Sequence, residues 1–265
     1  MCKVSVIIPC YNQGEYLETA VQSVLEQTHQ NFEIIIVNDG STDQATNQIL
    51  ARYDRPHTRV LHTENQGLAA ARNNGIREAV GKYILPLDAD DKIASNYLEK
   101  AINVLENTPE VGIVYSKAET FGAVKGPWFA AEYSLRGMLL GNLIFCTALF
   151  RKETWQAVGG YNPNMAHGWE DWDFWLSIIE RGGEVYRIPE FLFFYHVKQI
   201  SMAKSMDITK RVDMHMRIMR NHPALYIENA RPLIKLYYGI TGSSLYRILK
   251  RLKVPYFISS LLRKK

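Results

Sequence analysis

The chain has 265 residues, of which 47% are hydrophobic and 22% are charged, and these values are typical of a globular protein with a sizeable core. Its net charge of +4 combines a body of net charge −5, residues 1–228, with a tail, residues 229–265, that holds nine Lys or Arg and no Asp or Glu. This distribution argues against a general nucleic-acid binder and favours a local contact between the tail and an anionic surface.

Neither a secretory signal nor a membrane-spanning segment is expected. The three cysteines lack metal-ligand spacing and are too few for a disulfide framework, which favours a reducing compartment. The longest uncharged run, the 14 residues between Arg136 and Arg151, is too short for a spanning helix. Met1 leads directly into an apolar strand-like run, without the pattern of a signal peptide. We therefore expect a cytoplasmic protein.

Strand-like and helical patterns alternate over the first 115 residues. The predicted strands comprise residues 4–9, 32–37, 59–62, 83–87 and 111–115. The predicted helices comprise residues 14–27, 42–53, 68–79 and 96–106. Ser41 or Thr42 is expected to cap the second helix. Nearly continuous apolar strands that alternate with such helices predict an α/β fold, with a mostly parallel sheet covered by helices on both faces.

The second half of the chain is less regular. Short strands are expected at residues 144–150, 185–188 and 191–196. An amphipathic helix over residues 171–181 ends at two glycines, which is a C-cap signal. From Asp207 onward the pattern is helical, with expected breaks at Pro223, Pro232 and Pro255.

Three carboxylates follow the fourth predicted strand, at Asp88, Asp90 and Asp91. In an open α/β sheet, ligands bind at the carboxyl ends of the strands. Acids this close repel one another, and a divalent cation bridged to a diphosphate would relieve that repulsion. A solvated turn with a helix-capping aspartate is an equally good interpretation of this segment by itself.

Other segments carry polar groups suited to a nucleotide or a sugar. Asp39 follows the second strand and could accept a hydrogen bond from a base. Arg72, one turn into a helix of small residues, could face the nucleotide. Glu170 and Asp171 open a helix among three tryptophans, where a partly desolvated carboxylate could act as a general base. Taken singly, these are also explained by an ordinary loop, an exposed arginine and acids at a helix N-terminus.

Six segments occur in an order that resembles the family 2 glycosyltransferases, which have the GT-A fold. The resemblance covers roughly residues 3–200 and rests on Ser5–Asn12, Val37–Asp43, Asn65–Asn73, Asp88–Asp91, Val158–Tyr161 and Glu170–Asp171. It implies a GT-A catalytic domain over residues 1–205, made of a nucleotide-binding half (1–115) and an acceptor-binding half (116–205). A helical extension with a basic tail, residues 206–265, would follow.

The resemblance assigns the nucleotide-sugar donor to residues from the first half. Pro9 and Tyr11 would hold the base, and Asp39 would form a hydrogen bond with it. Arg72 would reach the base or the phosphates. Asp88 would bind the ribose or help to position a metal complex.

The same resemblance assigns the metal and the chemistry. Asp90 would ligate a divalent cation, Mn²⁺ or Mg²⁺, across the diphosphate, and His196 matches a position that meets the metal or the diphosphate. Asp171 would be the catalytic base, and Glu170 would orient the acceptor.

These roles imply an inverting transfer of a hexosyl or N-acetylhexosaminyl group. The donor would be a nucleoside-diphosphate sugar, with UDP expected, and the acceptor a glycan or a lipid-linked hydroxyl in cell-surface polysaccharide, lipopolysaccharide or glycoconjugate assembly. The tail mixes basic and apolar residues and could dock peripherally on the inner face of the cytoplasmic membrane. A solvated basic helix or an oligomer contact is the alternative.

Other functions stay open at this point. Asp88 and Asp90 could serve a Mg-dependent phosphatase or phosphotransferase, although such pairs usually follow the first strand. A non-catalytic nucleotide-sugar binding module is a further alternative, against which the intact acidic pairs argue. A nicotinamide dehydrogenase is disfavoured, because the segment after Pro9 lacks the glycine-rich turn.

Overall fold

The computed structural model describes residues 4–128, 131–166, 168–198 and 207–243. The chain divides into two compact units, Met1–His222 and Pro223–Lys265. Helix α9 (Ile208–Asn221) therefore groups with the sheets of the first unit.

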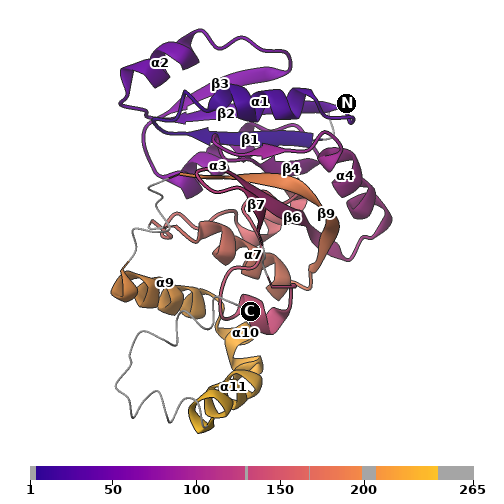
Figure 1. Cartoon of the computed structure of the whole chain (residues 1–265), viewed down its shortest axis with the longest axis vertical. Coiled ribbons are helices and arrows are strands. Elements are labelled where there is room, and N and C mark those ends of the chain that lie inside the picture. Colours follow the sequence, from indigo (N-terminus) through magenta and orange to yellow (C-terminus); the bar gives the residue numbers. More distant parts are fainter. Residues whose placement is uncertain (1–3, 129–130, 167, 199–206, 244–265) are drawn as a thin grey trace. The chain divides into compact units, whose positions relative to one another are not determined.

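The first sheet has five strands in the order β3-β2-β1-β4-β8. Figure 1 labels the first four of them. Its parallel strands are β1 (Val4–Cys10), β2 (Phe32–Asp39), β3 (Thr58–Thr63) and β4 (Tyr83–Pro86). β8 (Phe150–Arg151) pairs antiparallel to β4. The predicted α/β fold with a mostly parallel sheet is confirmed. The strand expected over residues 144–150 is reduced to β8 and an isolated bridge between Val114 and Leu149.

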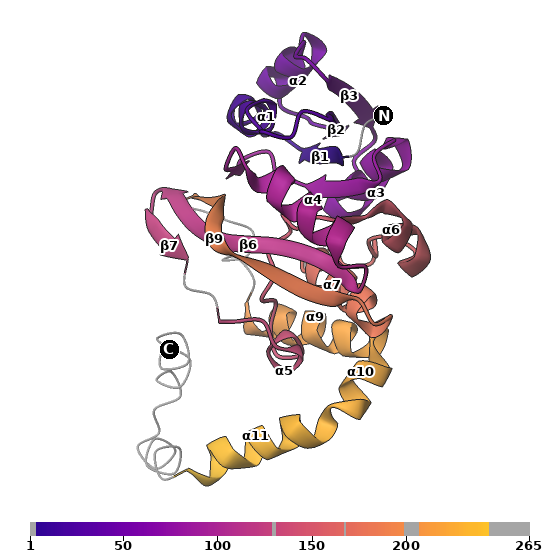
Figure 2. The ribbon, with the colours of Figure 1, turned by 90° about the vertical axis from the view of Figure 1, so that its right-hand side faces the viewer.

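Helices cover both faces of this sheet. They are α1 (Leu17–Leu25), α2 (Gln44–Ala51) and α3 (Leu68–Glu78). Figure 2 shows α1 and α2 on one face of β1, β2 and β3, and α3 on the other. The cap of α2 is Asp43, whose carboxylate accepts a hydrogen bond from the Thr46 N–H at 2.8 Å, so the expected cap at Ser41 or Thr42 was wrong.

The side chains of β1 alternate between the two faces. Val6 and Ile8 belong to the core beneath α1, whereas Ile7 faces α3. A Cβ added at Gly75 of α3 would lie 2.6 Å from Cγ2 of Ile7 and 2.9 Å from Cγ2 of Val37. The small residues of α3 therefore let its backbone approach the sheet closely.

The second sheet has the strand order β5-β9-β6-β7. Its strands are β5 (Lys92–Ile93), β6 (Val111–Gly122), β7 (Gly126–Trp128) and β9 (Glu184–Val197). β9 replaces the two short strands expected at 185–188 and 191–196, because irregularities in its pairing with β6 accommodate the residues between them. The strand expected at 111–115 is the first part of the longer β6.

The remaining helices of the first unit pack around these sheets. They are α4 (Tyr97–Asn107), α5 (Leu135–Met138), α6 (Lys152–Val158), α7 (Glu170–Glu180) and α9. α7 buries Trp172, Phe174 and Trp175. Nε2 of His222, directly after α9, lies 3.2 Å from a carboxylate oxygen of Asp173, which ties the end of α9 to α7.

The second unit contributes α10 (Pro223–Glu228) and α11 (Ala230–Gly242). Pro223 begins α10, as its missing N–H allows. Pro232 lies in the first turn of α11 and does not break it, so that expected break was wrong. Pro255 lies outside the described residues. Over the described part of the chain, no helix combines the length and the apolar character needed to cross a membrane.

Candidate active site

Arg72 connects the two halves of the candidate site. Its guanidinium is buried, donates to Asp88 at 2.7 Å, and pairs with Glu170, which lies 98 residues away in the sequence. Its Cζ also lies 5.6 Å from the ring centre of Tyr161. Removing one partner of such a buried pair costs about 3–5 kcal/mol, because the other charge is left uncompensated. Arg72 therefore joins the acidic segment after β4 to the start of α7.

Asp171 lies beside this ion-pair network and is half-buried. Asn142 donates a side-chain hydrogen bond to its carboxylate at 2.9 Å, and the Trp172 N–H donates another at 2.8 Å. Burial, followed by the charge of Glu170, raises the pKa of Asp171 to about 7. A carboxyl group with this pKa can accept a proton and release it again near neutral pH.

The three acids after β4 have three different partners. Asp88 binds Arg72 and also accepts from the Cys146 thiol at 3.3 Å. Asp90 pairs with the Lys198 ammonium at 2.8 Å. Asp91 is buried and accepts the backbone N–H of His196 at 2.8 Å. Burial, and then the charges of Asp88 and Asp90, raise the pKa of Asp91. Asp91 thus fixes the end of β9 against the acidic segment Asp88–Asp91, whereas the carboxylate of Asp90 is partly exposed.

The imidazole of His196 forms neither a hydrogen bond nor an ion pair with Asp90 within the described part of the chain. It stacks on Phe121, with 4.8 Å between ring centres, and meets the edge of Tyr16 at 5.3 Å. Its Nδ1 is buried and has no hydrogen-bond partner within the described residues. His196 therefore reaches the acidic segment after β4 through its backbone N–H, whereas its ring packs between Phe121 and Tyr16.

The side chains around Asp90 suit a divalent cation whose ligands come mainly from phosphate. Among the described residues, no three His, Cys, Asp or Glu side chains converge into a metal site. A Mg²⁺ or Mn²⁺ ion bound to a diphosphate needs only one or two protein carboxylates and completes its shell with phosphate and water oxygens. Asp90 fits this requirement, because its carboxylate is partly exposed and belongs to a bend crowded with negative charge.

The predicted base-binding residues lie at the carboxyl ends of β1 and β2. Pro9 is buried within β1 and pairs with Val37, and Tyr11 is 44% exposed just beyond the strand. The Asp39 carboxylate accepts the backbone N–H groups of Gln66 and Gly67, each at 3.0 Å. Gly67, the N-cap residue just before α3, has φ of 86°, which favours glycine. Asp39 thus shapes the loop that leads into α3.

The structure brings some predicted residues together and keeps others apart. Arg72, Asp88 and Glu170 are in direct contact, Asp171 adjoins them, and Asp90 shares its bend with Asp88. Asp39 and Tyr11 lie apart from that network, at the ends of their own strands.

Sequence reasoning missed several residues of this region. They are Asn12, Asn142, Cys146, Tyr161 and Lys198. Asn12 and Tyr161 end two of the segments that carry the family resemblance, and Asn142 is a polar residue that interrupts the long uncharged run, so these three had a visible signal. Asn12 accepts the backbone N–H groups of Thr42 and Asp43, each at 2.8 Å, and so couples the loops after β1 and β2.

Comparison with known proteins identifies the family. The model for glycosyl transferase family 2 matches residues 5–166. This chain belongs to that family. A second family model, the N-terminal domain of galactosyltransferase, matches residues 140–202 of this glycosyltransferase.

Curated relatives agree with this assignment. An uncharacterized glycosyltransferase of Haemophilus influenzae is 30% identical over 86% of this chain and 79% of its own length. The putative teichuronic acid biosynthesis glycosyltransferase TuaG of Bacillus subtilis is 34% identical over 76% of this chain and 82% of its own. Some relatives are much longer: the match to an uncharacterized glycosyltransferase of Rickettsia bellii covers 68% of this chain and 26% of that protein.

Solved structures show the GT-A fold. The crystal structure of Staphylococcus aureus TarS 1–349 in complex with UDP aligns with a TM-score of 0.67 at 20% identity, over 85% of this chain and 65% of that chain. The structure of the same fragment in complex with UDP-GlcNAc aligns with a TM-score of 0.68, over 83% of this chain and 66% of that chain. This glycosyltransferase thus spans about two thirds of the TarS fragment.

Proposed function

We propose that this glycosyltransferase moves a sugar from a nucleoside-diphosphate sugar to an acceptor hydroxyl with inversion at the anomeric carbon, and that Asp171 is the catalytic base. The observation that carries the proposal is the environment of Asp171. Its carboxyl group has a pKa of about 7, is oriented by Asn142, and adjoins the network of Arg72, Asp88 and Glu170. A base with a pKa near the working pH combines an adequate ionised fraction with a useful driving force for proton transfer.

The donor we propose is a UDP-sugar that carries a hexosyl or N-acetylhexosaminyl group. The complexes of TarS with UDP and UDP-GlcNAc, on the same fold, support this choice. In this chain, the exposed Tyr11 and the Asp39 loop border the carboxyl ends of β1 and β2, where nucleotides bind in open α/β sheets.

A divalent cation, Mn²⁺ or Mg²⁺, would be held by Asp90 together with the diphosphate, and His196 is the nearby candidate for a further contact. Such a cation neutralises the charge that builds up on the departing diphosphate. The Asp90 carboxylate pairs with the Lys198 ammonium at 2.8 Å, so a divalent cation bound by Asp90 would have to replace that ammonium.

The remaining steps, proton transfer and orientation of the acceptor, are assigned to residues of the chain. Asp171 takes the proton of the acceptor hydroxyl as its oxygen attacks the anomeric carbon, and a single displacement of this kind inverts the configuration. Glu170, held by Arg72, would orient the acceptor. Arg72 holds Glu170 and Asp88 in place, because its guanidinium is buried between these two acids. The proposed role of Glu170 therefore depends on its ion pair with Arg72, whereas Asp171 is held by Asn142 and the Trp172 backbone N–H.

The acceptor we propose is a glycan or a lipid-linked saccharide in cell-surface polysaccharide, lipopolysaccharide or glycoconjugate assembly. The similarity to TuaG, whose name refers to teichuronic acid biosynthesis, supports a polysaccharide acceptor. The phosphotransferase alternative needs Asp88 as a free nucleophile, whereas Arg72 and Cys146 both engage its carboxylate. That contact favours sugar transfer over phosphoryl transfer.

Replacement of Asp171 by Asn tests the proposal. Donor hydrolysis and transfer, followed with a panel of nucleotide sugars and Mn²⁺, are expected to fall by at least about a hundredfold, because base catalysis of this kind contributes roughly 10²–10⁴. Binding of UDP, followed by the shift in melting temperature, should stay within about twofold of the unmodified protein.

Asn142→Ala is the matched control, because it removes one hydrogen bond to the base and keeps the carboxyl group. We expect it to retain a measurable part of the activity that Asp171→Asn loses. A parallel loss of UDP affinity in Asp171→Asn would contradict the role of a base.

A further inference from the structure

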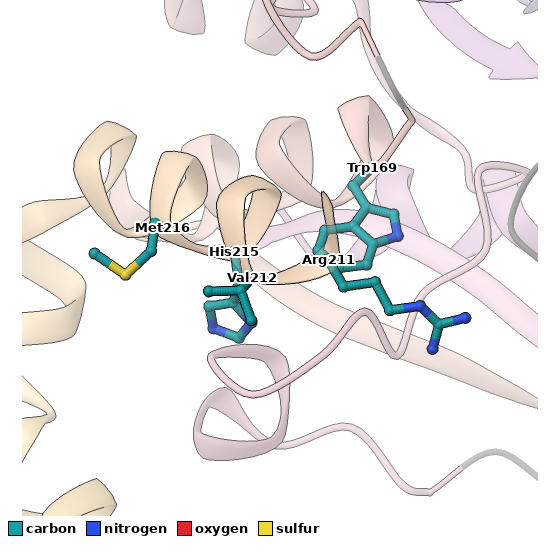
Figure 3. A pocket seen from close by; sticks show the side chains of 5 residues that line it. All are labelled: Trp169, Arg211, Val212, His215 and Met216. Carbon is teal, nitrogen blue, oxygen red and sulfur yellow. The ribbon is translucent and has the colours of Figure 1, made fainter. Parts of the chain in front are cut away.

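A pocket of about 290 Å³ opens beside the start of α7 (Figure 3). Five residues line it: Trp169, Arg211, Val212, His215 and Met216. The last four come from α9 at positions i, i+1, i+4 and i+5, so that they share one side of that helix. Trp169 directly precedes Glu170 and Asp171. The pocket therefore lies at the end of α7 that carries the proposed base.

Neighbouring aromatic rings hold the indole of Trp169 in place. The buried Trp172 contacts Trp169 edge-on at 5.3 Å between ring centres and contacts His215 edge-on at 5.1 Å. The indole Nε1–H of Trp172 donates to the carbonyl of Met138 at 2.7 Å, which fixes the orientation of that ring. Trp169 itself has φ of 65°, a left-handed backbone conformation that is costly for a bulky residue and concentrates at functional sites. The walls of the pocket are thus preformed.

The lining combines an apolar platform with one permanent charge. An indole face and the side chains of Val212 and Met216 suit the C–H face of a sugar ring, as in other apolar pockets that bind small ligands. Burial lowers the pKa of His215, so its ring is neutral at pH 7. The guanidinium of Arg211 carries the positive charge of the lining, and its fork of N–H donors matches a carboxylate or a phosphate.

We propose that this pocket is an acceptor subsite for a saccharide that carries an oxyanion, a carboxylate or a phosphate, with its ring on Trp169 and its anionic group at Arg211. The inference rests on the proposed function, because it takes the acceptor to enter on the side of Asp171. The donor is placed at the other end, at the ends of β1 and β2. Helix α9 lies beyond both segments that the family models match, 5–166 and 140–202.

Binding of simple saccharides to the full chain tests this subsite. The probes are methyl β-D-glucuronide, glucose 6-phosphate and the neutral methyl β-D-glucoside, each titrated by ligand-observed NMR. We expect either or both anionic probes to bind at least about tenfold more tightly than the neutral one. Carboxylate and phosphate are distinguished by which anionic probe binds more tightly.

Three variants test whether the saccharides bind in this pocket. Arg211→Gln should weaken the anionic probes about tenfold, to the level of the neutral one, and Trp169→Leu should weaken all three. Arg220→Gln is the matched control, because it removes the same charge from an exposed position in the last turn of α9, outside the pocket. It should leave every probe unchanged.

Three results would overturn the subsite. They are equal binding of charged and neutral probes, equal effects of Arg211→Gln and Arg220→Gln, and no binding of any probe at 50 mM, which is about the concentration at which weak fragments saturate. UDP binding by the unmodified chain is measured in parallel. If UDP does not bind, the proposed function fails. If UDP binds and the saccharides do not, only the subsite fails.

Discussion

At the residue scale, the surroundings of Asp171 set its charge state. The same carboxyl group in water would ionise at pH 3.8, whereas burial and the charge of Glu170 bring its pKa to about 7. Arg72 opposes this shift but is already shared between Glu170 and Asp88. The site therefore gives its two adjacent acids different roles: Glu170 is paired with a buried cation, while Asp171 keeps a proton affinity that is useful near neutral pH.

The pKa of Asp171 predicts an acidic limb in the pH profile. A base acts only when it is ionised, so kcat/KM should rise about tenfold per pH unit below 7 and level off above it. The measurement is kcat/KM for a nucleotide sugar between pH 5 and 9. A profile that stays flat from pH 5 to 8 would show that Asp171 is not the titrating base.

The same pKa predicts a pH-dependent effect on stability. Because the folded-state pKa of about 7 lies above the value of 3.8 for the unfolded chain, the unfolded state loses its proton first, and the carboxyl group destabilises the fold increasingly as pH rises from 3.8 to 7. Asp171→Asn removes this penalty. The gain in melting temperature from Asp171→Asn should therefore be larger at pH 8 than at pH 5, as measured by calorimetry. An equal gain at both pH values would count against the raised pKa.

At the scale of the element, α3 shows how packing positions a functional side chain. Its small residues allow the helix to lie close to β1 and β2, and Arg72 projects from it into the interior between Asp88 and Glu170. A helix with larger side chains at this interface would stand further from the sheet. The Arg72 guanidinium would then no longer reach both acids.

Gly75→Ala tests the close approach of α3 to the sheet. The added methyl would meet Cγ2 of Ile7 at 2.6 Å and Cγ2 of Val37 at 2.9 Å, and these β-branched side chains have little freedom to move. We expect destabilisation by about 1–3 kcal/mol, despite the better helix propensity of alanine. Urea denaturation measures it.

Arg77→Ala on the same helix is the control. Arg77 is exposed, so its replacement should change the stability by less than about 0.5 kcal/mol. If Gly75→Ala were neutral or stabilising, the interface would be looser than the structure shows.

At the scale of the whole molecule, acidic residues prevail in the body of the chain and basic residues in its tail. Residues 1–228, with a net charge of −5, comprise the first unit, which holds the candidate active site, and the six residues that follow it. The nine basic residues of the tail come after them. In α11, the exposed Ile234, Tyr237 and Tyr238 add apolar surface to this basic segment. We propose that the tail, most of which lies outside the described residues, attaches this glycosyltransferase to an anionic membrane surface where a lipid-linked acceptor would lie.

Sedimentation with vesicles tests this attachment. The full chain should pellet with vesicles that contain phosphatidylserine and not with neutral phosphatidylcholine vesicles, and added salt should release it. Replacing Arg263, Lys264 and Lys265 together by Gln should weaken binding substantially, since each basic residue near the surface contributes about 1 kcal/mol.

A matched triple replacement in the first unit, Arg52, Arg77 and Lys125 by Gln, serves as the control and should not change the sedimentation. These three side chains are exposed. If the full chain and the tail variant pelleted equally, the basic residues of the tail would not be responsible for membrane binding.

The sequence by itself determined the elements and the family. Apolar periodicity within short windows predicted the parallel strands and the helices between them, and the order of six motifs indicated a family 2 glycosyltransferase. Such patterns are local, because they depend on which face of one element is buried. They therefore placed Asp88, Asp90, Glu170 and Asp171 at the correct ends of their elements.

Only the tertiary structure decided how those side chains are paired and charged. Arg72 had looked like an exposed helix residue or a nucleotide ligand, and it is buried between two acids from distant segments. Asn142 and Lys198 reach Asp171 and Asp90 from loops with no motif of their own. Pairing and desolvation depend on what distant segments bring into contact. No local pattern contains that information, so the pKa of Asp171 and the pocket beside Trp169 appear only in the folded chain.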